Sequence, residues 1–235
     1  MYKIFMGYTS YQDVVYQVAK HSIERHSKDI VKVYPIIQSA LKELGIYYRK
    51  VDRKGSTEFS ITRFLTPWLA GYKGWVLFCD NDVLALDDIG KLFAQADDKY
   101  AIMCVKHNYQ PQESVKLDNQ LQTQYPRKNW SSIVLWNCNH SKNKFITPDL
   151  VNEVSPMFLH RFMWLESHEI GSLSCQWNWL VEWNKETRDG KPKMLHFTEG
   201  GPYFRAYQDV EYAELWRAEY RLYSGKDFTE NDLID

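Results

Sequence analysis

Two aspartates separated by one residue follow a strongly apolar stretch in the first half of the chain. The segment from Trp75 to Val83 reads WVLFCDNDV, and its apolar run ends at Asp80 and Asp82. We expect a buried strand that delivers both carboxylates to a sheet edge, because residues two apart on a strand point to the same side. Ligands of α/β proteins bind at the carboxyl ends of strands, so the pair is well placed to hold a divalent cation. The alternatives are that the aspartates only terminate the strand or cap the helix that follows.

A histidine ahead of two glycines is the second feature that could do chemistry. His196 precedes Gly200 and Gly201 in the segment KMLHFTEGGP. Consecutive glycines let backbone N–H groups approach an anion closely, as phosphate-binding loops require. A lone histidine is more often a packing residue than a ligand, but a nitrogen donor beside two carboxylates would favour Mn²⁺ over Mg²⁺. From its own residue type, His196 is open to both interpretations.

The composition limits the class of protein that can contain these residues. The chain has 235 residues, of which 44% are apolar and 25% charged, enough to bury the core of one domain. Its net charge of -1 provides no basic field for nonspecific nucleic-acid binding. No apolar segment reaches the length of a membrane span or of a signal-peptide core. The four cysteines are widely spaced and form no CxxC pair, so we expect free thiols and a cytoplasmic location.

The elements that must position these residues indicate an α/β fold. Apolar spacing predicts strands at residues 3–8, 29–37, 75–80, 100–105, 131–136 and 194–198, and helices at 13–24, 38–44, 87–96, 156–165 and 207–223. This alternation favours a mostly parallel sheet flanked by helices on both faces. We expect one domain over residues 1–202, with a helical tail at 203–235 packed against it.

Taken together, the motifs resemble those of the GT-A nucleotide-sugar glycosyltransferases, and within them the retaining glycogenin and bacterial galactosyltransferase family. The resemblance is carried by the DND motif after an apolar strand, by His196 ahead of a glycine-containing loop, and by the opening segment IFMGYTS. It covers residues 2–202. It implies a Rossmann-like GT-A fold and transfer of a sugar from a nucleotide-diphosphate sugar, with UDP expected first, to a saccharide or other hydroxyl acceptor.

The same resemblance implies roles for individual residues. A Mn²⁺ ion, with Mg²⁺ as the alternative, would be held by Asp80, Asp82 and His196. The donor nucleotide and its phosphates would be contacted by Gly7, Tyr8, Thr9, Arg63, Asn81, Gly200 and Gly201. The group facing the donor sugar in a front-face retaining mechanism would be one of Gln176, Asn178 and Glu166.

The sequence departs from the family pattern in two places. Relatives carry a lysine before a Pro-Trp pair in the C-terminal loop, whereas this chain reads EGGPY, so phosphate contacts must come from backbone N–H groups, Arg63, Arg127 or Lys128. The acidic-glutamine motif near the sugar is replaced by SCQWNW, in which we expect Trp177 or Trp179 to touch substrate. Both departures concern the donor sugar more than the class of reaction.

Two other functions share part of the pattern. A haloacid-dehalogenase-like phosphatase would use Asp80 as nucleophile and Asp82 as acid/base. Its motif normally lies on the first strand and is followed by a second acidic pair, and this sequence shows neither feature. A non-catalytic module that binds nucleotide sugars would keep the pocket without turnover, although the metal ligands mainly serve the departure of the nucleotide.

Overall fold

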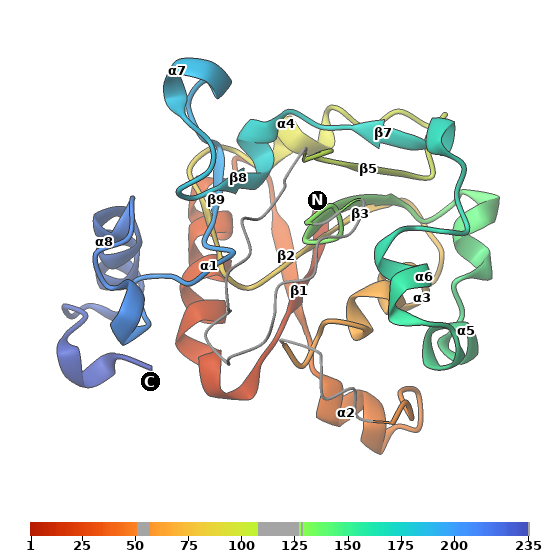
Figure 1. Cartoon of the computed structure of the whole chain (residues 1–235), viewed down its shortest axis with the longest axis horizontal. Coiled ribbons are helices and arrows are strands. Elements are labelled where there is room, and N and C mark those ends of the chain that lie inside the picture. Colours follow the sequence, from red (N-terminus) through yellow and green to blue (C-terminus); the bar gives the residue numbers. More distant parts are fainter. Residues whose placement is uncertain (51–56, 108–126, 128, 235) are drawn as a thin grey trace.

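A computed structural model describes residues 1–50, 57–107, 127 and 129–234, with a mixed sheet between helical layers (Figure 1). The main sheet has six strands in the order β2-β1-β3-β6-β5-β7. Their bounds are Tyr2–Gly7 (β1), Val31–Ile36 (β2), Trp75–Cys79 (β3), Ile102–Cys104 (β5), Ile133–Asn137 (β6) and Ile170–Ser172 (β7). β1 is parallel to β2 and β3, and β5 is parallel to β7, whereas β6 is antiparallel to both of its neighbours. The predicted α/β class is confirmed.

A second sheet of three short strands begins directly after the DND motif and contains His196. β4 (Val83–Ala85), β9 (Met194–His196) and β8 (Trp179–Leu180) lie in the order β4-β9-β8. β9 is antiparallel to β4, with Val83 opposite His196, and parallel to β8. Because only residues 80–82 separate β3 from β4, the chain passes from one sheet to the other at the DND motif.

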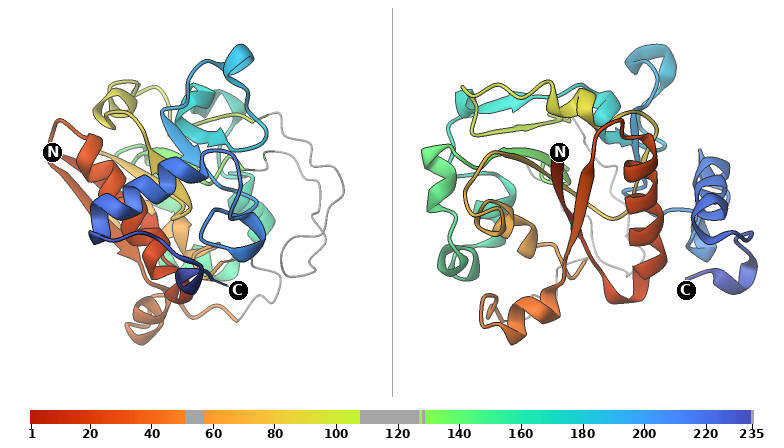
Figure 2. Two further views of the ribbon diagram at one scale, coloured as in Figure 1. Left: turned by 90° about the vertical axis from the view of Figure 1, so that its left-hand side faces the viewer. Right: turned by 180° about the vertical axis from the view of Figure 1, so that it is seen from behind.

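Helices cover both faces of the main sheet, and the tail helix lies outside them. The α-helices are Asp13–His26 (α1), Gln38–Glu43 (α2), Thr66–Leu69 (α3), Gly90–Phe93 (α4), Pro148–Glu153 (α5), Pro156–His160 (α6), Glu186–Asp189 (α7) and Ala213–Ser224 (α8). Short 3-10 helices span Ser10–Gln12, Thr62–Leu65, Ser141–Phe145, Ser167–Glu169, Cys175–Asn178, Arg205–Tyr207 and Glu230–Asp232. Figures 1 and 2 show α8 beside α1, on the side away from the main sheet.

The alternation of side chains along β3 explains the two main cores. Val76 and Phe78 pack into the cluster formed with α3, α5 and α6, whereas Leu77 and Cys79 pack into the cluster formed with α1 and α4. A third cluster joins α1, the second sheet and α8 around the fully buried Trp216. The tail therefore packs on the same body as the sheet.

Several elements are shorter than the sequence pattern predicts. The helix expected over 156–165 ends at His160, and Phe162 follows with a φ of 49°, a backbone conformation that a right-handed helix excludes. The tail helix begins only at Ala213, because Tyr212 has a φ of 65°. The helix expected over 87–96 is confined to α4. Among the described residues, no helix is both long enough and apolar enough to cross a membrane.

Candidate metal centre

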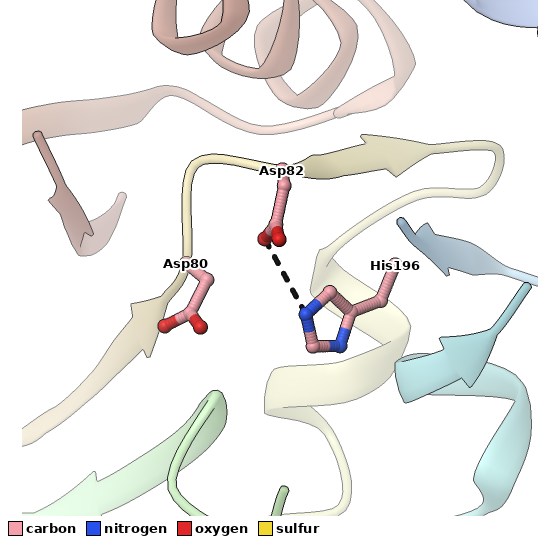
Figure 3. A group of neighbouring side chains, drawn as sticks. All are labelled: Asp80, Asp82 and His196. Carbon is pink, nitrogen blue, oxygen red and sulfur yellow. Dashed lines mark ion pairs between the residues drawn. The ribbon is translucent and has the colours of Figure 1, made fainter. Parts of the chain in front are cut away.

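A bend between the two sheets brings Asp80 and Asp82 together (Figure 3). The sequence predicted that one strand delivers both aspartates, but the structure does not place them on a shared strand. β3 ends at Cys79, and β4 starts only at Val83. The backbone N–H of Asp80 donates to the carbonyl of Ser132 at 2.9 Å and extends the pairing of β3 with β6. The carbonyl of Asp82 accepts from the N–H of Phe197 at 2.9 Å and extends the pairing of β4 with β9. Each aspartate is therefore anchored to a different sheet.

His196, at the end of β9, completes a group of three candidate metal ligands. Its Nε2 lies 3.3 Å from Asp82 Oδ1 (Figure 3), and one donor atom from each of the three residues lies within 4.8 Å of the others. His196 is buried, while the side chains of Asp80 and Asp82 are 13% and 23% exposed. Two carboxylate oxygens and one imidazole nitrogen form a donor set suited to a divalent cation such as Mn²⁺. We conclude that these residues fit a divalent cation.

The three groups shift one another's ionisation. Burial raises the pKa of the Asp80 carboxyl to about 6, although the charge of Arg63 opposes this shift. Burial also acts to raise the pKa of Asp82, but His196 outweighs it, and the pKa of Asp82 is lowered. Burial acts to lower the pKa of His196, and the Asp82 and Asp80 carboxylates outweigh it, so this pKa is raised. A proton on His196 thus balances part of the charge that a divalent cation would balance.

Arg63 lies directly against the candidate ligands. Its Nη1 is 2.7 Å from Asp80 Oδ1, and the same atom donates to the carbonyl of Ser131 at 3.1 Å. Its guanidinium carbon lies 5.2 Å from the ring centroids of both Phe59 and Phe78, within the range of cation–π attraction. The guanidinium is therefore fixed beside Asp80. Its contact with donor phosphates stays a prediction.

The residues predicted to line the nucleotide pocket lie where β1 ends, beside β3. Gly7 lies under the ring of Phe59, and a Cβ at this position would be 2.4 Å from the ring. The hydroxyl of Tyr8 donates to Asp13 Oδ1 at 3.1 Å. Thr9 is buried, and its Oγ1 has no hydrogen-bond partner in the described part of the chain. A buried hydroxyl without a partner is consistent with a ligand contact, and the pocket itself stays a prediction.

The middle residue of the DND motif is turned into the protein. Asn81 is buried, and its Nδ2 donates to Oε1 of Gln12 at 3.2 Å. Gln12 is itself buried and ends the short helix after β1. Asn81 thus ties the bend to the short helix that follows β1, which gives it a structural contact beside its predicted contact with the donor.

Tyrosine rings occupy the space that the two C-terminal-loop glycines leave. A Cβ on Gly200 would lie 2.6 Å from the ring of Tyr207, and the φ of Gly200 is 147°. A Cβ on Gly201 would lie 2.3 Å from the buried ring of Tyr203. Packing therefore explains both glycines, and backbone conformation is a second reason at Gly200. Their predicted approach to phosphate remains a prediction.

The three residues predicted to face the donor sugar lie in different surroundings. Glu166 is exposed and caps the short helix that follows it. Gln176 lies against Gly190: a Cβ added at Gly190 would be 2.6 Å from Gln176 Nε2. Asn178 is fully buried, and its Oδ1 lies 2.8 Å from Nδ1 of His196. Of these three, only Asn178 contacts a candidate metal ligand within the described part of the chain.

The aromatic and basic side chains expected near the substrate also have defined positions. Trp177 and Trp179 are both 0% exposed, and packing in the core explains both side chains. The contact of one of them with substrate stays a prediction. Arg127 donates to the carbonyl of Arg161 and, at 3.3 Å, to Ser167 Oγ. Lys128 lies outside the described residues.

Three residues beside the candidate metal centre carried no recognisable signal in the sequence: His107, Asn129 and Ser132. Ser132 Oγ accepts from Asn178 Nδ2 at 3.0 Å and donates to the carbonyl of Asn129 at 2.8 Å. Burial, with the nearby charge of His196, lowers the pKa of His107 to about 3, so its ring is neutral. These residues belong to no motif, and only the placement of β6 between β3 and β5 brings them to the site.

Comparison with known proteins identifies one similar curated sequence. The chain is 49% identical over 234 residues to Protein CDI of Arabidopsis thaliana, and the match covers 98% of this chain and 90% of that protein. No protein-family model matches the chain.

Similar solved structures are glycosyltransferases. GlyE of Streptococcus pneumoniae TIGR4 matches with a TM-score of 0.62 at 14% identity, over 93% of this chain and 60% of that chain. The galactosyltransferase LgtC, solved with donor and acceptor sugar analogues, matches with a TM-score of 0.60 at 11% identity, over 97% and 98%. Mouse xyloside xylosyltransferase 1 matches with a TM-score of 0.51 at 12% identity, over 84% and 97%. This chain spans 60% of the GlyE chain, and the likeness at these identities is one of fold.

Proposed function

Because the chain belongs to the family of Arabidopsis Protein CDI and has the GT-A fold of glycosyltransferases, we propose that it transfers a sugar from a nucleotide-diphosphate sugar to a hydroxyl acceptor. The observation that carries this proposal is the cluster of Asp80, Asp82 and His196, whose donor atoms lie within 4.8 Å of one another. The cluster lies beyond the carboxyl end of β3, at the edge where ligands of α/β sheets bind.

The three clustered residues hold the cation in the proposed reaction, with Mn²⁺ as the first choice and Mg²⁺ as the second. A divalent ion bound there stabilises the negative charge that grows on the departing nucleotide diphosphate, so no general acid has to protonate that group. Arg63, fixed between Phe59 and Phe78, adds a second positive charge on the side of Asp80. Without a cation, the guanidinium of Arg63 and a proton on His196 balance the charges of the two carboxylates.

We propose UDP as the donor nucleotide, a saccharide or glycoconjugate as the acceptor, and retention of configuration at the sugar. These choices follow the resemblance to the glycogenin and bacterial galactosyltransferase family. Gln176 and Glu166 remain candidates for the sugar-side group. We also propose a cytoplasmic location, which agrees with four free cysteines, three of them buried.

Release of nucleoside diphosphate tests the proposal. The protein is incubated with Mn²⁺ and a panel of nucleotide sugars without acceptor, and we expect slow release from the correct donor. Asp82→Asn keeps the shape of the side chain but removes its charge, and should reduce release by more than about 100-fold. Asp97→Asn, a surface aspartate paired with Lys99, should leave the rate unchanged.

Each rival function predicts a different outcome of this assay. Release of inorganic phosphate from simple phosphomonoesters, lost in Asp80→Asn, would support the phosphatase. Binding of nucleotide sugars without any release, with or without acceptors, would support the non-catalytic module. Equal release by the parental protein and Asp82→Asn would contradict the metal site.

A further inference from the structure

We propose that Asn178 is a positioning residue that fixes the tautomer of His196 and thereby aims the lone pair of His196 Nε2 at the cation. This inference rests on the proposed metal site and names the residue that orients one of its ligands. Asn178 ends the short helix Cys175–Asn178 and is 0% exposed. Its side chain lies between His196 on β9 and the residues that enter β6.

A backbone carbonyl sets the direction of the hydrogen bonds that reach Asn178. Ser132 Oγ lies 2.8 Å from the carbonyl oxygen of Asn129. A carbonyl oxygen can only accept, so this bond uses the hydroxyl proton of Ser132. Ser132 Oγ must then accept from Asn178 Nδ2, which lies 3.0 Å away and also lies 3.4 Å from the carbonyl of Asn129. The amide nitrogen of Asn178 is therefore held on the side of β6.

The same amide must present its oxygen to His196. Asn178 Oδ1 lies 2.8 Å from Nδ1 of His196, and an amide oxygen has no proton to donate. Nδ1 must therefore carry the proton, which leaves the lone pair of the neutral imidazole on Nε2. Nε2 is the nitrogen that lies 3.3 Å from Asp82 Oδ1, on the side of the candidate ligands. The hydrogen bonds thus select the tautomer that can bind a cation together with Asp82.

These contacts and the burial of Asn178 direct its side chain into the protein and away from a donor sugar. Its Nδ2 is bonded to Ser132, its Oδ1 is bonded to His196, and the whole side chain is removed from solvent. The structure thus supports a role behind the metal ligand in place of the sugar-side role that the sequence suggested.

Histidine tautomer and cation affinity can both be measured on the intact protein. We expect ¹⁵N chemical shifts of the metal-free protein, at a pH where the imidazole is neutral, to show the proton of His196 on Nδ1. In Asn178→Ala this tautomer should no longer dominate, and the Kd for Mn²⁺ should rise about 10–100-fold. Asn178→Asp keeps an acceptor for Nδ1–H and should preserve both the tautomer and the affinity. Ser132→Ala frees the amide of Asn178 to rotate. It should change the tautomer of His196 and the Kd for Mn²⁺ in the same direction as Asn178→Ala, but by a smaller amount.

Asn143→Ala is the matched control. Asn143 is equally buried and donates to the carbonyls of Ala101 and Asn137, so its loss should lower stability without changing the tautomer or the Kd. A folded Asn178→Ala with the parental tautomer and affinity would overturn the positioning role. So would a proton on Nε2 in the metal-free parental protein. Failure of the parental protein to bind Mn²⁺, with its proton on Nδ1, would instead overturn the metal site of the proposed function.

Discussion

At the scale of single residues, Asp80 has the least favourable surroundings of the three candidate ligands for carrying a charge. Its carboxylate is largely buried beside Asp82, and one guanidinium, that of Arg63, pairs with it. Burial therefore outweighs the ion pair and raises the pKa of Asp80 to about 6. A divalent cation at this position would displace the proton that the carboxyl otherwise retains.

We expect the affinity for Mn²⁺ to depend on pH around this value. Below pH 6 the proton on Asp80 competes with the cation, and the raised pKa of His196 adds a second competing proton. Affinity should therefore fall at least about tenfold for each pH unit well below 6 and level off at higher pH. Calorimetric titrations between pH 5 and pH 8 measure this. An affinity that is constant over that range would contradict the role of Asp80 as a ligand.

The same shift has a consequence for the stability of the metal-free protein. The pKa of Asp80 is about 6 in the folded chain, above its ordinary value of 3.8, so the folded state binds this proton more tightly than the unfolded state. The contribution of Asp80 to stability is therefore lost as the pH rises from about 4 to 6. The increase in Tm caused by Mn²⁺ should grow over this interval in thermal melts. If the increase in Tm caused by Mn²⁺ were largest at pH 4, the raised pKa of Asp80 in the folded state would be contradicted.

At the scale of elements, the loop after β9 is shaped by aromatic packing. Gly201→Ala would place a methyl group 2.3 Å from the buried ring of Tyr203, and we expect a loss of about 1–3 kcal/mol in the free energy of unfolding. Urea denaturation measures this without any nucleotide. The double variant Gly201→Ala/Tyr203→Leu should lose less than the sum of the two single variants, because the shorter side chain relieves the clash. Full additivity would show that the ring is not what excludes a side chain at this position.

The apolar patterns predicted the elements that carry the ligands. β3 and β9 lie where the sequence placed them, and the DND motif follows β3 as expected, because a buried strand needs a continuous apolar run that can be read locally. The turn that brings Asp80 and Asp82 together was not predicted. It depends on β4 joining a second sheet through pairing with β9, a contact between segments far apart in the chain.

The surroundings of the ligands were less predictable than the ligands themselves. Ser132 and Asn129 reach the site only because β6 is inserted antiparallel between β3 and β5. Asn178 was singled out from the sequence, but its position behind His196 depends on the short helix Cys175–Asn178, which was not predicted from the sequence. Hydrogen bonds between such distant segments leave no periodic pattern in a sequence.

At the scale of the whole molecule, one buried carboxylate joins the tail helix to the body. Glu219 on α8 has a side chain that is 4% exposed, and it accepts from Arg25 and contacts His21, both on α1. Burial acts to raise the pKa of Glu219, but these two partners outweigh it, so the pKa is lowered. The stabilisation is therefore present above the ordinary value of 4.5 and is lost as the pH falls below it.

A double-mutant cycle measures how strongly the tail is joined to the body. We expect Arg25→Ala and Glu219→Ala each to lower stability, with a coupling of about 1–2 kcal/mol, because the bond is charge-assisted while Arg25 remains 42% exposed. Denaturant unfolding at pH 7 and at pH 4 measures the coupling, which should be smaller at pH 4. Coupling near zero at pH 7 would show that apolar packing alone holds α8 in place.

The pairing of β4 with β9 makes the candidate metal centre a reporter of completed folding. Val83 pairs with His196, and the carbonyl of Asp82 accepts from Phe197, so two segments from distant parts of the chain must meet in one register. A slip of a single residue would turn His196 to the opposite face of the sheet. A misfolded or partly assembled chain therefore contains all three ligands without a place for a cation. Cation capture would distinguish native molecules from compact non-native ones in a mixed population.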